Sequence, residues 1–335
     1  MTVIRNFNEP FALTDLTEEL LIVPNTWGLV NELGIFNNQP VAENTITFEE
    51  SNSTIGLISD QVRGTRANVN SDGTRKVRSY ALPHFPLDDF ISPSDVRGIR
   101  AYGSDNAETV DAVMQRKIER IRRNHAITLE YARCVALTTG DIYAPNGTVS
   151  GNYYTDFGIT RKSISFALAG SGDVIAKGEE AIAHIQDNIM NGEVVTSVTA
   201  ICSPEFFSAL IANASVKDAY KFYTSTTEPQ RNRVGTGLYR TFSHGGVDYI
   251  EYRGNYNGEA LIPAGKAYFI PRGTEETFIS HFGPANKFGS LGTLGEESYM
   301  WAYRDAKDSK IEIESEANFL NLVRRPQCVV VGTAS

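Results

Sequence analysis

The sequence has few of the residues that build covalently linked or metal-stabilised folds. Three cysteines, Cys134, Cys202 and Cys328, are spread over 335 residues and form no Cys-x-x-Cys pair. Neither a zinc site nor a disulfide framework is therefore predicted, and buried free thiols are the expected state. The five histidines are scattered, with none at metal-ligand spacing from another histidine or a cysteine. We expect neither a metal centre nor a cofactor.

The chain also lacks the motifs of the common enzyme classes. It contains no Gly-x-Ser-x-Gly elbow, and the glycines of 258–266 are too far apart for a phosphate-binding loop. Asp88 and Asp89 are adjacent, so their side chains diverge in a strand or loop and do not predict a shared acid/base site. We predict a protein that is not an enzyme. A soluble α/β enzyme with an unrecognised site is the less favoured alternative.

Long hydrophobic runs and excess positive charge are missing as well. No apolar run approaches 18 residues, so no membrane-spanning helix is predicted. The formal net charge is −9, which argues against the whole protein being a nucleic-acid coat, because binding to duplexes depends on many Lys and Arg contacts to phosphate. An acidic surface that faces DNA would instead repel it and let it slide.

One long segment, Asp105 to Thr139, contains neither glycine nor proline and predicts a single helix. Asp105 and Glu108 form a capping-box pattern at its start, and Gly140 stands where a glycine would end it. His125 lies in the apolar sector, where a half-buried, hydrogen-bonded histidine is expected. The apolar side of the helix contains Val110, Val113, Met114, Ile118, Ile121, Leu129, Ala132 and Ala136.

A basic stripe follows the same segment beside its apolar side. Arg116, Arg120 and Arg123 are spaced i, i+4 and i+7, which places them on one face of a helix. Such a stripe is either a solvated charged face or a docking surface for an acidic partner, which could be a neighbouring subunit or nucleic acid. The pattern alone leaves both interpretations open.

Residues 41–90 predict a two-stranded ribbon with a polar tip. Ile46 and Phe48 alternate with polar residues, and the segment Lys76 to Leu82 can pair with them in antiparallel fashion. The stretch between, Ser59 to Arg75, is too polar to form a core. It is either a surface loop or an arm that becomes ordered only against another subunit, because an isolated ribbon is marginally stable in water.

The two ends of the chain have different patterns. Residues 1–40 predict an arm in which Trp27 is either a core residue or an anchor into a neighbour. Beyond residue 158 the pattern is α/β, with a helix at Asp173 to Met190 whose inner side includes Ile175. The other predicted segments are a strand at Val194 to Cys202, a helix capped at Ser203, strands at 247–253 and 266–271, and C-terminal alternating segments at 310–314, 318–324 and 327–331.

This order of segments resembles the lambda-type major capsid (head) proteins of tailed bacteriophages and prophages. The likeness rests on short stretches that are individually weak but occur in the right order along nearly the whole chain. They include Leu16-Thr17-Glu18-Glu19-Leu20, Pro24-Asn25-Thr26-Trp27-Gly28, Ile91-Ser92-Pro93-Ser94-Asp95, Ser203-Pro204-Glu205-Phe206-Phe207, His281-Phe282-Gly283-Pro284-Ala285 and Ile311-Glu312-Ile313-Glu314-Ser315.

The resemblance implies an α+β, HK97-like phage capsid fold with five parts. Residues 1–40 would be the N-terminal arm and 41–90 the extended E-loop. Residues 91–159 would form the peripheral domain, with its spine helix at 105–139. The axial domain would take 160–305, and the strands of 306–335 would return to complete both sheets.

The resemblance also implies a structural function. Many copies would assemble, with a separate scaffold protein, into an icosahedral head that also contains a portal, encloses double-stranded DNA without sequence-specific binding and could carry a decoration protein. The expected location is the virion, after assembly in the bacterial cytoplasm. An encapsulin-like compartment shell is the alternative. Subunit contacts are expected from Trp27, Arg63, Arg66, Arg75, Arg116, Arg120 and Arg123.

Overall fold

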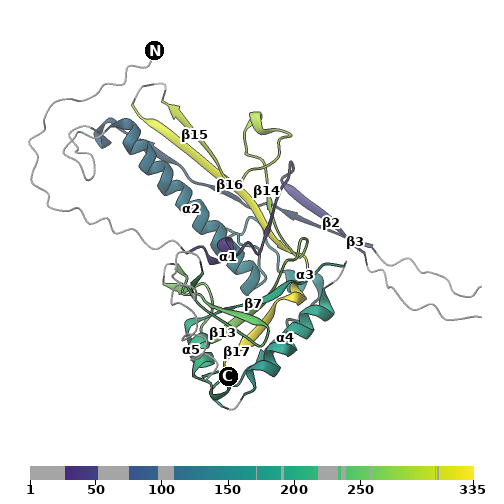
Figure 1. The fold of residues 1–335 in the computed structure, drawn as a ribbon. Coiled ribbons are helices and arrows are strands. Elements are labelled where there is room, and N and C mark those ends of the chain that lie inside the picture. The colour runs from purple at the N-terminus through teal and green to yellow at the C-terminus, as the bar shows by residue number, and fades with distance from the viewer. Residues whose placement is uncertain are drawn as a thin grey trace, which may run out of the picture.

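The structure, a computed structural model, is built from one long helix, two larger sheets and a projecting ribbon (Figure 1). It describes residues 27–51, 75–96, 109–170, 172–189, 192–217, 233–234, 239–256, 258–305, 307 and 309–335. Of the contact residues expected from the sequence, Arg63 and Arg66 lie outside these ranges. The helix predicted to begin at Asp105 also starts outside them.

Helix α2 (Val110–Thr138) is the longest helix among the described residues. Thr109 is extended and its side-chain oxygen accepts a hydrogen bond from the amide of Ala112, so Thr109 caps α2. The predicted end is confirmed, because the amide of Gly140 bonds the Val135 carbonyl with φ at +80°. A Cβ there would also lie 2.5 Å from the Tyr154 ring.

The apolar side of α2 faces β16, as its periodicity predicts. Val113 and Ile121 pack with Ile313 of that strand. His125 is buried and its Nε2 lies 2.9 Å from the Ser315 hydroxyl, which confirms the prediction of a satisfied histidine.

A six-stranded sheet carries this helix. Its central strand is β16 (Ile311–Val323), a single strand of 13 residues. The predicted segments 310–314 and 318–324 are therefore parts of one strand. The separation was wrong because Ser315 and Glu316 interrupt the apolar pattern in the sequence, yet both are buried and pair with neighbouring strands in the sheet. The partners of β16 are β14 (Phe278–Phe282), β15 (Tyr299–Arg304), β4 (His84–Pro86) and β5 (Asp89–Ile91), while β1 (Asn37–Pro40) pairs with β14.

A seven-stranded sheet forms the other part of the body. Its order is β6-β17-β13-β7-β10-β9-β8, and it mixes parallel pairs (β10–β7 and β17–β6) with antiparallel ones. Its strands are β6 (Ser163–Ser165), β7 (Ser197–Cys202), β8 (Arg233–Val234), β9 (Tyr239–His244), β10 (Val247–Glu251), β13 (Lys266–Arg272) and β17 (Val330–Thr333).

Helices α4 (Val174–Asn188) and α5 (Pro204–Ala212) pack on the seven-stranded sheet and bury Ile185 and Phe206 there. Ser203 caps α5 as predicted, with its hydroxyl oxygen accepting from the Phe206 amide. Two predictions for this region were wrong, namely the inward orientation of Ile175 and the start of the strand before α5. Ile175 is 43 % exposed and therefore not on the inner side of α4, and Val194 is 70 % exposed, so strand β7 begins at Ser197.

Further short elements complete the described chain. They are α1 (Leu29–Leu33), α3 (Tyr153–Phe157), η1 (Pro93–Asp95), η2 (Phe288–Ser290), η3 (Pro326–Cys328) and the small pair β11 (Asn255–Tyr256) and β12 (Glu259–Ala260).

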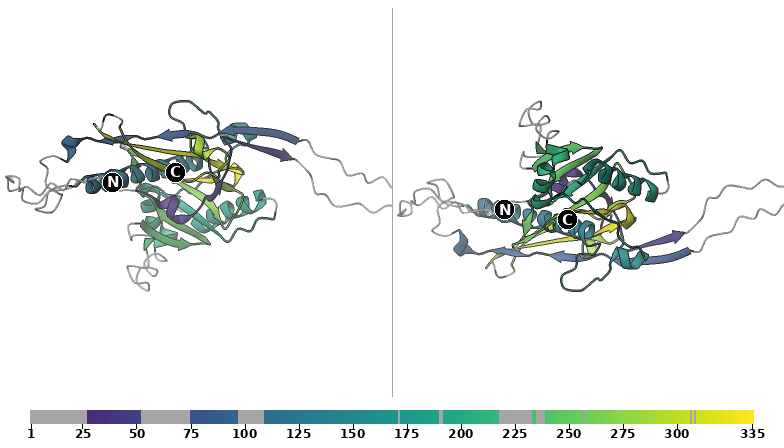
Figure 2. Two further views of the ribbon diagram at one scale, coloured as in Figure 1. Left: turned by 90° about the horizontal axis from the view of Figure 1, so that it is seen from above. Right: turned by 90° about the horizontal axis from the view of Figure 1, so that it is seen from below.

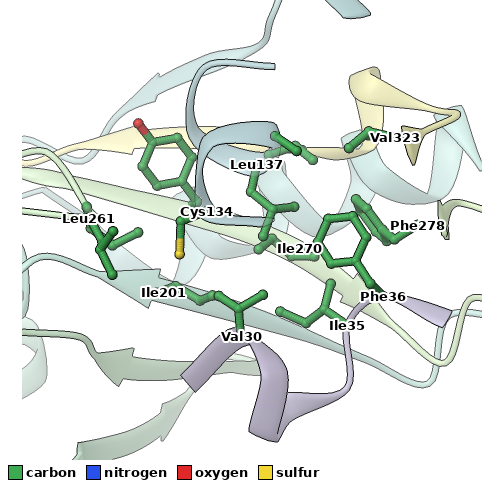
Figure 3. Packing of buried hydrophobic residues seen from close by; sticks show 14 of the residues in the cluster. Val30, Ile35, Phe36, Cys134, Leu137, Ile201, Leu261, Ile270, Phe278 and Val323 are labelled. Carbon is green, nitrogen blue, oxygen red and sulfur yellow. The ribbon is translucent and has the colours of Figure 1, made fainter. Parts of the chain in front are cut away.

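The largest apolar core lies where the two sheets, α1 and the C-terminal end of α2 meet (Figure 3). Val30 and Leu137 come from the two helices, Ile201 and Ile270 from the seven-stranded sheet, and Phe278 from the six-stranded sheet. One core therefore joins segments more than 200 residues apart in the sequence. A second core lies between the seven-stranded sheet and helices α4 and α5.

The pairing of the sheets bears on the expected division of the chain. Strands β14 and β15 lie within 160–305, yet both pair with β16 in the sheet beside α2, and β17 pairs with β13 and β6 in the other sheet. The C-terminal strands thus enter both sheets. The five-part division itself stays a prediction.

Candidate intersubunit surfaces

The first candidate surface is the ribbon formed by β2 (Thr45–Ser51) and β3 (Arg75–Ala81). The two strands are antiparallel, as the sequence predicted, and their register places Ile46 opposite Tyr80 and Ser51 opposite Arg75. Among the strands the structure describes, β2 and β3 pair only with each other. The ribbon extends away from the body (Figure 2). Arg75 lies at its far end, on the side of residues 52–74, which the structure does not describe.

Aromatic contacts hold the root of this ribbon to the body. The ring of Phe48 stacks on Phe157 of α3, with centroids 6.2 Å apart, and the Arg78 guanidinium lies 4.8 Å from the same ring. The hydroxyl of Tyr80 donates to the Asp156 carboxylate at 2.9 Å. One face of the ribbon is therefore committed to the subunit's own body.

The opposite face of the ribbon has no such cover among the described residues. Thr47 and Ser79 are exposed and their hydroxyls are 3.3 Å apart, while Val77 is 65 % exposed. Pairing of only two strands provides little stability in water. A ribbon that extends beyond its root is accordingly suited to lie on another molecule.

The second candidate surface is the basic stripe on α2. Arg116, Arg120 and Arg123 are all exposed, which agrees with their predicted common face. Arg120 donates to Asp89 of β5 at 2.8 Å, and Arg123 lies 3.7 Å from Glu119 on its own helix. At least part of the stripe therefore has acidic partners within the subunit, which sequence spacing did not reveal.

Asp89 ties this part of α2 to the edge of the sheet. Lys117 bonds it at 3.0 Å, in addition to Arg120. Burial opposes ionisation of Asp89, but hydrogen bonds from Lys117, the Phe90 amide and Arg120 outweigh it and hold the pKa of this carboxyl below its ordinary value. Asp95 also approaches Lys117, at 3.7 Å. Lys117 and Arg120 of α2 together with Asp89 of β5 thus form an intramolecular ionic clamp at one end of the stripe.

Trp27 lies within the subunit in a partly apolar setting. Its ring is half-buried, 6.2 Å from the ring of Tyr252 and 6.5 Å from that of Tyr239. These contacts support the interpretation of Trp27 as a core residue of its own chain. A contact between Trp27 and a neighbour stays a prediction.

Sequence reasoning missed a buried charged pair that links the N-terminal segment to α2. Glu130 is 1 % exposed, and its carboxylate accepts from the amides of Val30 and Asn31 at 2.8 and 2.9 Å and from the Tyr252 hydroxyl at 2.8 Å. The Glu130 carboxylate thus satisfies amides in the first turn of α1, and it connects this helix to α2 and to Tyr252 just after β10. Burial raises the pKa of Glu130, although the three hydrogen bonds oppose this shift.

The other member of the pair, Arg133, is 4 % exposed and binds three polar groups. Its guanidinium donates to Asn31 and Asn38, each at 2.7 Å, and to Ser280 of β14 at 3.1 Å. Burial lowers its pKa to about 10, so the group is charged at neutral pH. The only signal in the sequence was two opposite charges three residues apart on the buried side of a helix, and their partners are about 100 residues or more away.

The described residues contain no assembly of groups suited to bind a metal ion. The three cysteines are free and buried, as predicted, and burial raises the pKa of each thiol. Of the described helices, none is long and apolar enough to cross a membrane. Among the described residues, the β2–β3 ribbon and the basic stripe on α2 are the candidate surfaces for association.

Comparisons with known proteins show which family the chain resembles. The sequence profile of the family Phage major capsid protein E matches residues 12–334. The chain is 44 % identical to the major capsid protein of Pseudomonas phage KPP10, with all of both chains covered, and 27 % identical to that of Salmonella phage Felix O1, with 96 % of this chain and 95 % of the relative covered. These relatives are structural proteins, which confirms the expectation of a non-enzyme and does not favour the encapsulin-like alternative.

Solved structures support the fold. The capsid structure of cyanophage P-SCSP1u matches with a TM-score of 0.55 at 13 % identity, covering 97 % of this chain and 93 % of that one. The expected α+β, HK97-like fold is confirmed by this likeness together with the long helix, the two sheets and the projecting ribbon described above. The chain belongs to the phage major capsid protein E family.

Proposed function

We propose that many copies of this chain assemble into the icosahedral head of a tailed phage. Family membership supports this proposal, and the observation that carries it is the β2–β3 ribbon, whose strands extend from the body with only each other as partners among the described strands. An isolated ribbon of this kind gains stability by lying on another subunit. Residues 41–90 would then act as the E-loop of the shell.

The proposed assembly includes further partners. A separate scaffold protein would guide shell formation in the host cytoplasm, a portal would occupy part of the shell, and a decoration protein is a candidate for the outer surface. Double-stranded DNA would be enclosed without sequence-specific contacts, which fits a net charge of −9. The mature location would be the virion.

The proposal is tested by expressing the full chain alone and with a candidate scaffold protein. Negative-stain microscopy and sedimentation should then reveal closed shells. Monomers or small closed oligomers under every condition would contradict a capsid function. Limited proteolysis adds a second measurement, because cleavage within 59–75 should be rapid in free subunits and slow in shells.

The contact residues expected from the sequence form part of the same proposal. We assign Trp27, Arg63, Arg66 and Arg75 to contacts of the arm and the ribbon, and Arg116, Arg120 and Arg123 to an acidic surface of a neighbour. The 65 % exposure of the Arg120 side chain and the 52 % exposure of Arg123 support this assignment, because both retain surface for a second partner.

The stripe can be tested without disturbing the clamp at Asp89. Replacing Arg116→Glu and Arg123→Glu while keeping Arg120 should block assembly and leave the subunit folded, since repulsion between like charges at a contact opposes association. The matched control is Arg116→Lys with Arg123→Lys, which keeps the charge and should assemble. Normal shells from the double-Glu variant would make the stripe a solvated face.

A further inference from the structure

The loop between β14 and β15 carries an unusual group of exposed apolar side chains. Phe288 is 96 % exposed, Leu291 77 % and Leu294 63 %, all within seven residues. In Figure 1 this segment follows β14 and projects beyond the sheet. Exposed apolar residues that occur singly are ordinary, but a group of large ones on one projecting loop marks an interaction surface.

Both stems of this loop are anchored to the body. On the outgoing side, the Gly283 amide donates to the Asn318 carbonyl at 2.8 Å, and the Asn286 amide donates to the Glu316 carboxylate. Lys287 pairs with Glu314 and lies 5.1 Å from the ring of Trp301. The outgoing stem therefore follows β16 and β15 closely.

The returning stem is held equally well. The Gly295 amide donates to the Val41 carbonyl at 2.9 Å, and Asn38 donates to Glu297 at 2.8 Å. A Cβ at residue 295 would lie 2.2 Å from the Phe282 carbonyl oxygen, so the glycine allows the stem to approach β14 closely. Within the tip, the Thr293 amide and hydroxyl both bond the Ser290 carbonyl. Hydrogen bonds in both stems and in the tip therefore fix the position of the loop that carries the three apolar side chains.

The charge pattern of the tip favours contact with a like molecule. The stretch 288–295, Phe-Gly-Ser-Leu-Gly-Thr-Leu-Gly, contains no charged residue, although the whole chain has a net charge of −9. Two acidic molecules can approach at such a point without repulsion between carboxylates. The small apolar area of the tip also favours a contact that forms together with others in an assembly. Three side chains cover far less than the roughly 1,000 Å² of a stable pairwise interface.

From these observations we propose that the 286–295 loop docks through Phe288, Leu291 and Leu294 on a second copy of this chain. A small apolar contact contributes to association when other contacts between the same molecules form with it, and a symmetric assembly supplies this repetition. The inference rests on the proposed shell function and extends it by naming a contact outside the ribbon and the arginine stripe.

The test compares assembly of three forms of the full chain. The variant Phe288→Ser, Leu291→Ser, Leu294→Ser should raise the subunit concentration needed for assembly about tenfold or more, while its melting temperature stays that of the wild type, because the replaced side chains are exposed. The control Phe288→Leu, Leu291→Met, Leu294→Met keeps the apolar surface and should assemble as the wild type does. Equal assembly of the serine variant would overturn the inference.

A second measurement identifies the occupant and does not depend on the folding of the serine variant. A benzophenone-bearing amino acid placed at Leu291 and irradiated in assembled particles should form an adduct between two copies of the chain, located by mass spectrometry. An adduct to a different protein, or no adduct, would overturn the inference. Failure of the wild type to assemble would overturn the proposed function itself, whereas shells that tolerate three serines overturn this inference alone.

Discussion

The central strands of the seven-stranded sheet and the outer strand β15 of the six-stranded sheet are buried to very different degrees. In the seven-stranded sheet, β7 has five consecutive buried residues, with Ala200 facing the core under α4 and α5 and Ile201 facing the core next to α2. In the six-stranded sheet, β15 is half-buried over Tyr299–Trp301 and exposed over 302–304. Strands β7 and β13 of the first sheet are therefore covered on both faces by their own subunit, whereas the outer part of the second sheet is covered on one face.

The alternation along β15 and β16 explains this difference. Met300 and Ile313 face α2, so Trp301 and its cross-strand partner Glu314 lie on the opposite face of the sheet. The same outer region carries the 286–295 loop, and the β2–β3 ribbon leaves the body elsewhere as a separate pair of strands (Figure 1). One region thus stabilises the subunit, while the other leaves surface available for association.

The largest expected effect comes from truncating a buried aromatic side chain in the seven-stranded sheet. Phe269 is fully buried between Phe166 and Tyr249, so Phe269→Ala should lower the free energy of unfolding by about 3–5 kcal/mol. Trp301→Ala, on the half-covered strand, should cost no more than about 1 kcal/mol. Urea denaturation of both variants measures the contrast. Equal losses would show that the two sheets contribute alike to stability.

A somewhat smaller effect is expected where the N-terminal segment meets α2. Glu130→Ala leaves the amides of Val30 and Asn31 and the Tyr252 hydroxyl without their buried acceptor, and it removes the negative charge that favours the charged form of buried Arg133. Together these losses should cost about 3 kcal/mol. Glu130→Gln keeps one acceptor oxygen and should cost less. Denaturant melts measure the stability, and hydrogen exchange at residues 29–33 should increase in the alanine variant. Unchanged exchange there would contradict a role for Glu130 in holding α1.

The smallest effect is expected at the clamp on the edge of the six-stranded sheet, and it depends on pH. The pKa of Asp89 in the folded state lies below its ordinary value of 3.8, so its stabilising contribution is complete above that pH and is lost as pH falls through the folded-state pKa. Asp89→Asn should therefore cost roughly 0.5–1 kcal/mol at pH 6 and less at pH 3, measured by denaturant unfolding.

The neighbouring exposed carboxyl provides the control for this prediction. Asp88→Asn changes the same net charge one residue away and should leave stability nearly unchanged at both pH values. A cost for Asp89→Asn that does not shrink on acidification would contradict the ionic character of the clamp.

Local patterns predicted the elements whose causes are local. The cap at Ser203, the stop at Gly140 and the apolar side of α2 all depend on residues within a few positions of each other, and the structure confirms them. The antiparallel pairing of the segment that contains Ile46 and Phe48 with the segment Lys76 to Leu82 also followed from alternation in two nearby segments. Predictions failed where long-range burial decided the outcome, as at Val194, where strand-like composition lies outside the sheet.

The candidate surfaces also combine features that the sequence predicted with features that it could not show. Spacing placed Arg116, Arg120 and Arg123 on one exposed face of a helix, but it could not show that Asp89 pairs with Arg120, because the two residues meet only when β5 lies beside α2. The apolar loop was likewise invisible, since Phe288, Leu291 and Leu294 resemble ordinary core residues in the sequence. Exposure is a property of the folded surface and not of residue type.

Residue type and spacing over a few positions were enough to predict the order of segments, the long helix, the paired ribbon and the lack of recognised catalytic or metal-binding motifs. The folded structure was needed to show that β14 and β15 share a sheet with β16, that Glu130 and Arg133 join α1 to α2, and which apolar side chains face outward. Each depends on contacts between distant segments, and their free energy depends on burial, which spacing does not encode.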